Sequence, residues 1–196
     1  MPCRPRSISV AITGASGIAV SVRLLRAATE HGIRVVGIIV SRNAYVVARH
    51  ELGLSVEDFK SLLSQYSRVY GEEDYESPLA SSSSQPDAMV IVPASMKTVS
   101  QIAAGIQDNL IVRAALSILR LGRPLVVAPR ETPLGIAELQ ALLKVAHMGV
   151  KVVPLCPGYY HKPRSLNDLV DFMVGKILDV LGVDNDLYRR WGLQEG

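Results

Sequence analysis

The chain has 196 residues, of which 48% are hydrophobic and 20% are charged, and its formal net charge is +3. This composition supports a substantial buried core and excludes intrinsic disorder as a description of the whole chain. Membrane and nucleic-acid partners are not expected, because the apolar runs fall far short of the ~20 residues of a membrane-spanning helix and the basic residues are dispersed.

Short apolar runs alternate with segments of helical periodicity along the chain. We expect strands at residues 7–13, 34–40, 88–92, 124–128 and 150–153. We expect helices at residues 17–30, 43–52, 56–65, 98–105, 109–121, 134–148 and 166–181. This alternation predicts an α/β fold with a single doubly wound parallel sheet, in one domain that spans residues 1–196.

Residues 66–87 interrupt the alternation. The stretch is polar and rich in turn-forming residues, and it includes the acidic sequence Glu72-Glu73-Asp74 and a run of serines at 81–84. Insertions of this length are typically functional or mobile loops. A disordered loop without a function is the alternative interpretation.

Unusual residues follow the first predicted strand, at the edge of the sheet where open parallel sheets bind ligands. In Thr13-Gly14-Ala15-Ser16-Gly17, the glycines let backbone N–H groups approach an anion at the start of the next helix. The turn lacks the GxGxxG pattern, and Ser41-Arg42-Asn43 stands where a dinucleotide site requires an acidic residue. The pattern favours a mononucleotide such as FMN over NAD, with a purely structural turn as the alternative.

The loops after the later strands carry polar side chains as well. Ser95 and Thr98 suit a ligand contact or simple helix capping. Arg130 and Glu131 lie between two prolines, which suits two aimed side chains or a solvated ion pair. Tyr159 and Tyr160 follow the last strand, where they suit phosphate contact or apolar packing.

Histidines and cysteines show no metal-binding pattern. His31, His50, His147 and His161 are isolated in the sequence, and we expect them to be surface or capping groups. Cys3 and Cys156 have neither metal-ligand nor disulfide spacing. The two thiols favour a reducing, cytoplasmic location.

Taken together, these loops resemble those of the UbiX-type flavin prenyltransferases, formerly described as aromatic-acid decarboxylases, of the flavoprotein family. The resemblance keeps the order and spacing of the motifs over nearly the whole chain. It is carried by Thr13-Gly14-Ala15-Ser16-Gly17, Ser41 with Glu51, Pro93-Ala94-Ser95-Met96-Lys97-Thr98, Asp108-Asn109-Leu110 with Arg113, Arg130-Glu131-Thr132-Pro133-Leu134, Tyr160-His161-Lys162-Pro163 and Trp191.

The resemblance implies a Rossmann-like flavoprotein fold in a homo-oligomer, commonly a dodecamer, that binds FMN between subunits. It implies a metal-independent prenyltransferase that joins a dimethylallyl group from dimethylallyl phosphate to N5 and C6 of reduced FMN. The prenylated FMN would then serve a UbiD-type decarboxylase partner.

The resemblance also implies roles for individual residues. Ser16 and Glu131 would be the catalytic pair that handles protons. The residues contacting FMN would be Thr13, Gly14, Ala15, Ser16, Ser41, Ser95, Thr98 and Arg130. The residues around the donor phosphate and prenyl group, some from a neighbouring subunit, would be Glu51, Arg113, Arg120, Arg130, Tyr160, Lys176 and Trp191. Arg120 stands where the family often has Lys and Lys176 where it often has Arg, which keeps the charge but changes the hydrogen-bond geometry.

Two other functions fit parts of the pattern. An FMN-dependent cysteine decarboxylase shares this fold, but it typically needs a catalytic histidine, for which only His50 is nearby, and a methionine motif that this sequence lacks. A non-catalytic FMN-binding module would need no proton transfer by Glu131. The choice between a monophosphate and a diphosphate donor stays open.

Overall fold

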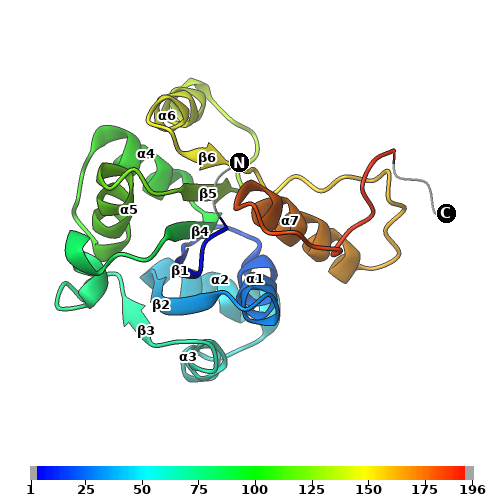
Figure 1. Cartoon of the computed structure of the whole chain (residues 1–196), viewed down its shortest axis with the longest axis horizontal. Coiled ribbons are helices and arrows are strands. Elements are labelled where there is room, and N and C mark those ends of the chain that lie inside the picture. Colours follow the sequence, from blue (N-terminus) through cyan, green and yellow to red (C-terminus); the bar gives the residue numbers. More distant parts are fainter. Residues whose placement is uncertain (1–3, 193–196) are drawn as a thin grey trace.

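A six-stranded parallel sheet forms the centre of the molecule, as a computed structural model of residues 4–192 shows (Figure 1). The strands are β1 (Ser7–Ile12), β2 (Arg34–Val40), β3 (Val69–Gly71), β4 (Ala88–Ala94), β5 (Leu125–Pro129) and β6 (Lys151–Val152). Their order is β3-β2-β1-β4-β5-β6, and every neighbouring pair is parallel. The order reverses between β1 and β4, and ligands of such sheets bind beyond the carboxyl ends of the strands at this point.

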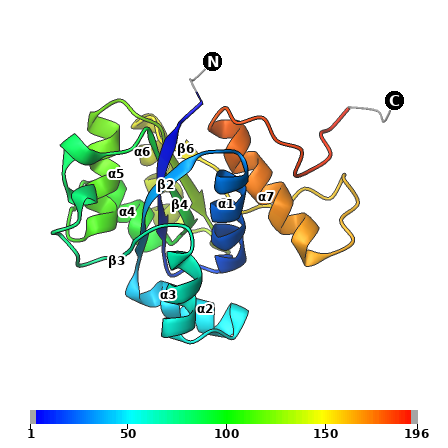
Figure 2. The ribbon, with the colours of Figure 1, turned by 60° about the horizontal axis from the view of Figure 1, so that its bottom comes forward.

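Helices cover both faces of the sheet (Figure 2). One face carries α1 (Ile18–Glu30), α2 (Arg42–Leu52), α3 (Val56–Ser64) and α7 (Leu166–Val180). The other face carries α4 (Met96–Ala104), α5 (Leu110–Arg120) and α6 (Ile136–His147). The predicted α/β fold with one doubly wound parallel sheet is therefore confirmed. Within residues 4–192, no helix combines the length and apolar character needed to cross a bilayer.

The central strands are continuous apolar runs because both of their faces are buried. In β4, Val90 and Val92 pack in the core beneath α1 and α7, whereas Met89 and Ile91 pack beneath α4 and α5. All four side chains are fully buried. Burial on both faces removes the alternation of polar and apolar residues that marks a half-exposed strand.

The prediction of a loop at residues 66–87 was wrong for part of the segment. This segment contains β3, which pairs with β2 at the edge of the sheet, and two short 3-10 helices, Pro78–Ala80 and Ser82–Ser84. With only three residues, β3 is too short to show a period in the sequence. Its pairing depends on β2, about thirty positions away, which no local pattern encodes.

Candidate functional site

The glycine turn after β1 is fixed by the loop after β4. Thr13 Oγ1 donates a hydrogen bond to the Pro93 carbonyl at 2.8 Å and accepts one from the Ser95 N–H at 2.7 Å. On its other side, Gly14 lies against the start of α2, where an added Cβ would stand 2.5 Å from Asn43 Cβ. The hydroxyl of Thr13, which was expected to contact FMN, therefore joins two loops of the chain. Position 14 must be glycine because Asn43 lies too close for a side chain.

A carboxylate of the chain itself caps α1. Glu51 accepts hydrogen bonds from the Gly17 N–H at 2.9 and 3.1 Å and from the Ile18 N–H at 2.8 Å. The positive end of the helix dipole attracts an anion there, so Glu51 fills the place where the glycine pattern predicts an anionic ligand. Gly17 adopts φ 113°, and the backbone around Ser16 is held between Thr13 and Glu51.

A polar pocket of about 460 Å³ opens at the carboxyl edge, between the loops that follow β1, β2 and β4. Its lining residues are Gly14, Ser41, Arg42, Asn43, Glu72, Glu73, Ser95, Lys97, Thr98, Gln101, Asp108 and Asn109. The structure thus brings together the predicted FMN contacts Gly14, Ser41, Ser95 and Thr98. The glycine turn and the loop at residues 93–98 were the sequence signal for this edge. Lys97 belongs to that motif but had no predicted role, and Gln101 was not predicted at all.

Two helix N-termini face this pocket. Ser41 Oγ accepts a hydrogen bond from the Ala44 N–H at 3.3 Å at the start of α2. Ser95 Oγ accepts one from the Thr98 N–H at 3.4 Å at the start of α4 and lies 3.1 Å from Thr98 Oγ1. Helix capping was one of the two interpretations of Ser95 and Thr98, and it is confirmed: Ser95 caps α4. Because helix N-termini attract anions, the pocket suits a phosphate.

The acidic side chains around the pocket are engaged by neighbouring donors. Glu72 accepts the Arg42 N–H at 2.8 Å, and Glu73 pairs with the Arg42 guanidinium at 2.6 Å. Asp108 accepts hydrogen bonds from the side-chain amide groups of Gln101 and Asn109. Lys97 has no ion pair within residues 4–192. On the α4 side of the pocket, the Lys97 cation offsets the charge of Asp108, so the attraction for an anion comes from the helix N-termini.

The Arg130-Glu131 loop lines a second pocket of about 230 Å³, together with Leu134, Leu155 and Cys156 among others. Arg130 Nε is buried and has no hydrogen-bond partner within residues 4–192. A buried donor without an acceptor costs roughly 1–3 kcal/mol, and more when it is charged. Glu131 is exposed and accepts the N–H of the next residue at 3.1 Å. Arg130 is therefore the strongest indication of an acceptor-bearing ligand.

The second pocket adjoins the glycine turn. Leu155, which lines it, lies so close to Gly17 that an added Cβ there would stand 2.8 Å from Leu155 Cδ1. Arg130 N–H also reaches the Ala94 carbonyl at 3.4 Å. Ser16 and Glu131 consequently lie at the same edge of the sheet, on either side of the end of β4.

Five of the seven residues expected around the prenyl donor fall into two groups, whereas Glu51 caps α1 and Arg130 lines the second pocket. Tyr160, Lys176 and Trp191 gather near α7: the ring centroids of Tyr160 and Trp191 are 5.1 Å apart, and Lys176 Nζ lies 5.5 Å from the Phe172 ring. By contrast, Arg113 and Arg120 lie on α5, which covers the other face (Figure 1). There Arg113 Nε donates to the Ala80 carbonyl and Arg120 to Ser117 Oγ, both at 2.8 Å. One chain does not bring the two groups together.

The expectation for the histidines is correct for His31, whose ring bonds the Ala27 carbonyl at the end of α1, but wrong for His161. The His161 ring stacks on the Phe172 ring, with 5.1 Å between the ring centroids and 4° between the ring planes. Both of its ring nitrogens are buried without a partner within residues 4–192. The aromatic neighbours Tyr160 and Phe172 were the sequence signal for a packed ring.

This strand order, with helix N-termini and polar pockets at the point where it reverses, defines a nucleotide-binding α/β protein. Consistent with that class, residues 2–178 match the family model described as Flavoprotein. A flavin prenyltransferase UbiX from Methanocaldococcus jannaschii is 42% identical over 185 residues, which is 94% of this chain and 98% of that protein. The chain therefore belongs to the UbiX flavin prenyltransferases, and its enzyme class is prenyltransferase.

Solved structures agree with this assignment. AnUbiX (PadA1), crystallised with FMN and dimethylallyl pyrophosphate, has a TM-score of 0.89 at 33% identity, covering 98% of this chain and 100% of that chain. A dodecameric FMN-dependent UbiX-like decarboxylase from Escherichia coli O157:H7 has a TM-score of 0.87 at 34% identity, covering 94% and 98%. The peptidyl-cysteine decarboxylase EpiD, at 15% identity and a TM-score of 0.62 over 89% of this chain and 97% of that one, shares the fold alone.

Proposed function

We propose that this chain joins the dimethylallyl group of dimethylallyl phosphate to N5 and C6 of reduced FMN, releasing phosphate and forming prenylated FMN. The single observation that carries the proposal is the buried, unpartnered Arg130 Nε, which lies at the same edge as the polar pocket between α2 and α4. Family membership supports the same reaction, because relatives at about 40% identity carry this name.

We propose that the FMN phosphate binds in the polar pocket. The start of α4 offers the hydroxyls of Ser95 and Thr98 and the cation of Lys97. Ser41 offers a hydroxyl from the start of α2, and the missing side chain of Gly14 keeps the backbone within reach of the ligand. Thr13 and Ala15 hold the turn in shape in this proposal. Reduced FMN, when bound, supplies the nucleophilic atoms that receive the prenyl group.

The donor phosphate would lie beside Arg130. Its Nε would donate a hydrogen bond to a phosphate oxygen and stabilise the negative charge that grows on the leaving phosphate. Glu131, next in the chain, would hold and return a proton at its carboxyl group, and Ser16 would do so from the glycine turn on the flavin side. Glu51, by capping α1, would keep Ser16 in place.

We propose that copies of this chain assemble into a homo-oligomer, as a dodecamer, through α6. Ile136, Leu139 and Leu143 lie on one face of this helix and are 76%, 53% and 59% exposed. An apolar patch of this kind is typical of a protein interface. A second copy is the occupant that fits best, because Arg113 and Arg120 reach the donor only from a neighbouring subunit, and the E. coli relative is a dodecamer.

Light scattering tests this interface. Changing both Leu139 and Leu143 to Glu should reduce the assembly to smaller species, since burying two carboxylates in an apolar contact is unfavourable. Ser61→Glu, at an exposed position of α3 on the opposite face of the sheet, should leave the assembly intact. A full-size assembly in the double variant would exclude this face.

The remaining parts of the proposal follow from the reaction. One domain over residues 1–196 would carry out the chemistry in the cytoplasm, which the free thiol of Cys156 supports. Cationic side chains would replace a metal ion at the phosphate, so EDTA should not reduce the rate. The product would pass to a UbiD-type decarboxylase.

Mass spectrometry of the flavin tests the proposal directly. Anaerobic incubation with reduced FMN and dimethylallyl phosphate should add one prenyl unit to the flavin, and parallel reactions with the pyrophosphate would identify the donor. Glu131→Gln and Ser16→Ala should slow the reaction by about 10²–10⁴-fold, the usual contribution of a proton-transferring group, whereas Glu57→Gln should not. Bound FMN without any mass shift would instead favour a non-catalytic flavin-binding module.

A further inference from the structure

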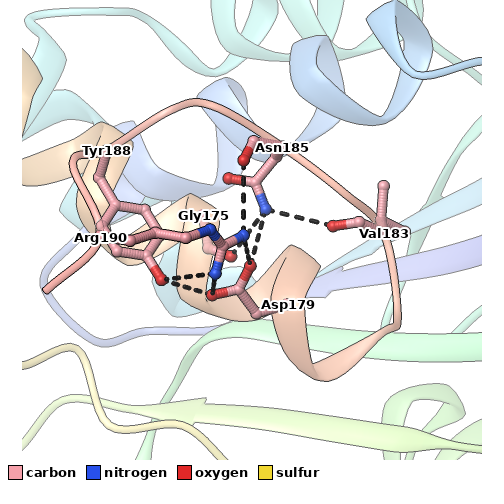
Figure 3. Close-up of polar contacts among 6 residues, drawn as sticks. All are labelled: Gly175, Asp179, Val183, Asn185, Tyr188 and Arg190. Carbon is pink, nitrogen blue, oxygen red and sulfur yellow. Dashed lines mark hydrogen bonds and ion pairs between the residues drawn. The ribbon is translucent and has the colours of Figure 1, made fainter. Parts of the chain in front are cut away.

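The segment after α7 folds back on the helix and is anchored at Asp179 (Figure 3). Asp179 Oδ1 accepts hydrogen bonds from Asn185 Nδ2 at 2.9 Å and Arg190 Nη2 at 2.7 Å. Its Oδ2 accepts one from the Tyr188 hydroxyl and one from Arg190 Nη1 at 3.2 Å. One carboxylate therefore holds three side chains of the segment, and its two oxygens are fully used.

These hydrogen bonds are strong enough to keep Asp179 charged although it is partly buried. Burial disfavours the carboxylate, but the hydrogen bonds from Arg190 and Tyr188 outweigh burial and hold the pKa of Asp179 below its usual range. The Arg190 contact is bidentate, the geometry that fixes a guanidinium most firmly. The anchor is therefore intact at neutral pH.

Tyr188 connects Asp179 to Lys176, because it contacts both residues. Its ring lies over Gly175, where an added Cβ would stand 2.4 Å from Tyr188 Cδ1. Lys176 Nζ lies 4.8 Å from the centroid of that ring. The nearby Tyr188 hydroxyl raises the pKa of Lys176. The position of Lys176 thus depends on Tyr188, and that of Tyr188 on Asp179.

A second path leads from Tyr188 to Trp191. The Tyr188 ring packs edge-on against the Phe172 ring, with their centroids 4.9 Å apart. The Phe172 ring in turn packs against Tyr160, with a centroid distance of 5.9 Å. Tyr160 packs against Trp191, with 5.1 Å between the ring centroids. Trp191 also follows Arg190 directly in the chain, so the bidentate pair with Asp179 limits where this ring can lie.

We propose that Asp179 is a positioning residue for the prenyl donor, which acts through Tyr188 and Arg190 to fix Lys176 and Trp191. This inference rests on the proposed function for the assignment of Lys176 and Trp191 to the donor. The anchor itself is a property of the structure. Asp179 makes no hydrogen bond or ring contact with either residue, but its charge also acts directly on Lys176 and helps to raise the pKa of that ammonium group. A purely structural role for Asp179 would stabilise the segment without affecting the donor.

Asp179→Asn tests the proposal in the full chain, with Asp186→Asn as the matched control on an exposed position of the same segment. An Asn keeps the size but loses the charge and faces the donors with an amide N–H₂. We expect KM for dimethylallyl phosphate to rise about tenfold, equivalent to ~1.4 kcal/mol, with kcat changed by less than about threefold and FMN affinity unchanged. Trp191, the one tryptophan of the chain, is already 78% exposed. Its fluorescence anisotropy, which measures how freely the ring moves, should therefore fall. Asp186→Asn should change none of these.

A double-mutant cycle identifies the route. In a Lys176→Ala background, Asp179→Asn should raise KM much less than alone, because residues acting through one another are not additive. Tyr188→Phe keeps the ring and removes only the hydroxyl, so it should raise KM about threefold even if Asp179→Asn folds poorly. A lowered tryptophan anisotropy with an unchanged KM in Tyr188→Phe and Asp179→Asn would overturn the proposal. If Lys176→Ala itself leaves KM unchanged, the assignment of Lys176 to the donor fails instead, and the positioning role fails with it.

Discussion

Thr13→Val removes the hydroxyl that links the loops after β1 and β4. This hydroxyl makes two hydrogen bonds, at 2.8 Å to the Pro93 carbonyl and at 2.7 Å from the Ser95 N–H, and Thr13 is only 1% exposed. Valine has nearly the same shape, so packing changes little. The Pro93 carbonyl keeps a second donor in the Thr13 N–H at 3.1 Å, whereas the Ser95 N–H loses the acceptor it uses here.

The expected loss follows from these contacts. The lost hydrogen bond to Pro93 contributes about 1 kcal/mol, and the Ser95 N–H left without its acceptor costs roughly 1–3 kcal/mol. The added methyl group offsets part of this, by about 1 kcal/mol. We therefore expect a loss of roughly 1–3 kcal/mol in the free energy of unfolding, equivalent to a fall in Tm of about 2–12 °C for a chain of this size.

Urea and thermal unfolding followed by circular dichroism measure this loss, with Thr29→Val as the control. The Thr29 hydroxyl donates only to the Leu25 carbonyl of its own helix at 3.1 Å, so that variant should lose less than about 1 kcal/mol. If Thr13→Val instead kept its stability while losing FMN affinity, Thr13 would be a ligand contact, and the structural role argued here would be wrong.

Three further changes probe the same edge and the anchor of the last helix. Gly14→Ala should destabilise the protein by about 1–3 kcal/mol and weaken FMN binding, measured by flavin fluorescence, because its Cβ would stand 2.5 Å from Asn43 Cβ. Glu51→Gln should lower the free energy of unfolding in urea by roughly 1–2 kcal/mol, because a neutral amide is not attracted to the N-terminus of α1. An unchanged urea midpoint of unfolding would contradict the capping role. The Asp179 carboxyl has a lowered pKa in the folded state. Its stabilisation of the segment is therefore complete above the unfolded value of about 3.9 and is lost only as pH falls through the lower folded value. The fluorescence anisotropy of the single tryptophan should stay constant from pH 8 to about 5 and fall only below about 4.

The fold could be predicted from the sequence because its central strands are continuous apolar runs separated by helical periods. Burial on both faces produces such runs, and the β1, β4 and β5 segments show them. Strand β3 escaped prediction because it has three residues and takes its structure from hydrogen bonds to β2. Edge strands are often this short, and so few residues show no recognisable alternation of polar and apolar positions.

The edge of the sheet that holds the site could be predicted as well, but not how the chain uses each side chain there. Thr13 and Glu51 are polar residues in a glycine turn and on a nearby helix, and their types suit a ligand as well as an internal partner. Their partners lie 80 and 34 positions away, at Pro93 and Gly17. A hydrogen bond between such distant residues leaves no local signature, so only the three-dimensional structure separates a ligand contact from a cap.

The separation of the expected donor-binding cations has a topological cause. Connections between parallel strands are right-handed, and the winding of this sheet changes direction between β1 and β4. Helix α5, in the connection from β4 to β5, therefore lies on one face, while α7 returns after β6 to pack beside α1 on the other. Arg113 and Lys176 consequently cannot meet within one chain without breaking the fold. A donor phosphate that contacts both must lie between two subunits, which makes the assembly a condition of the reaction proposed here.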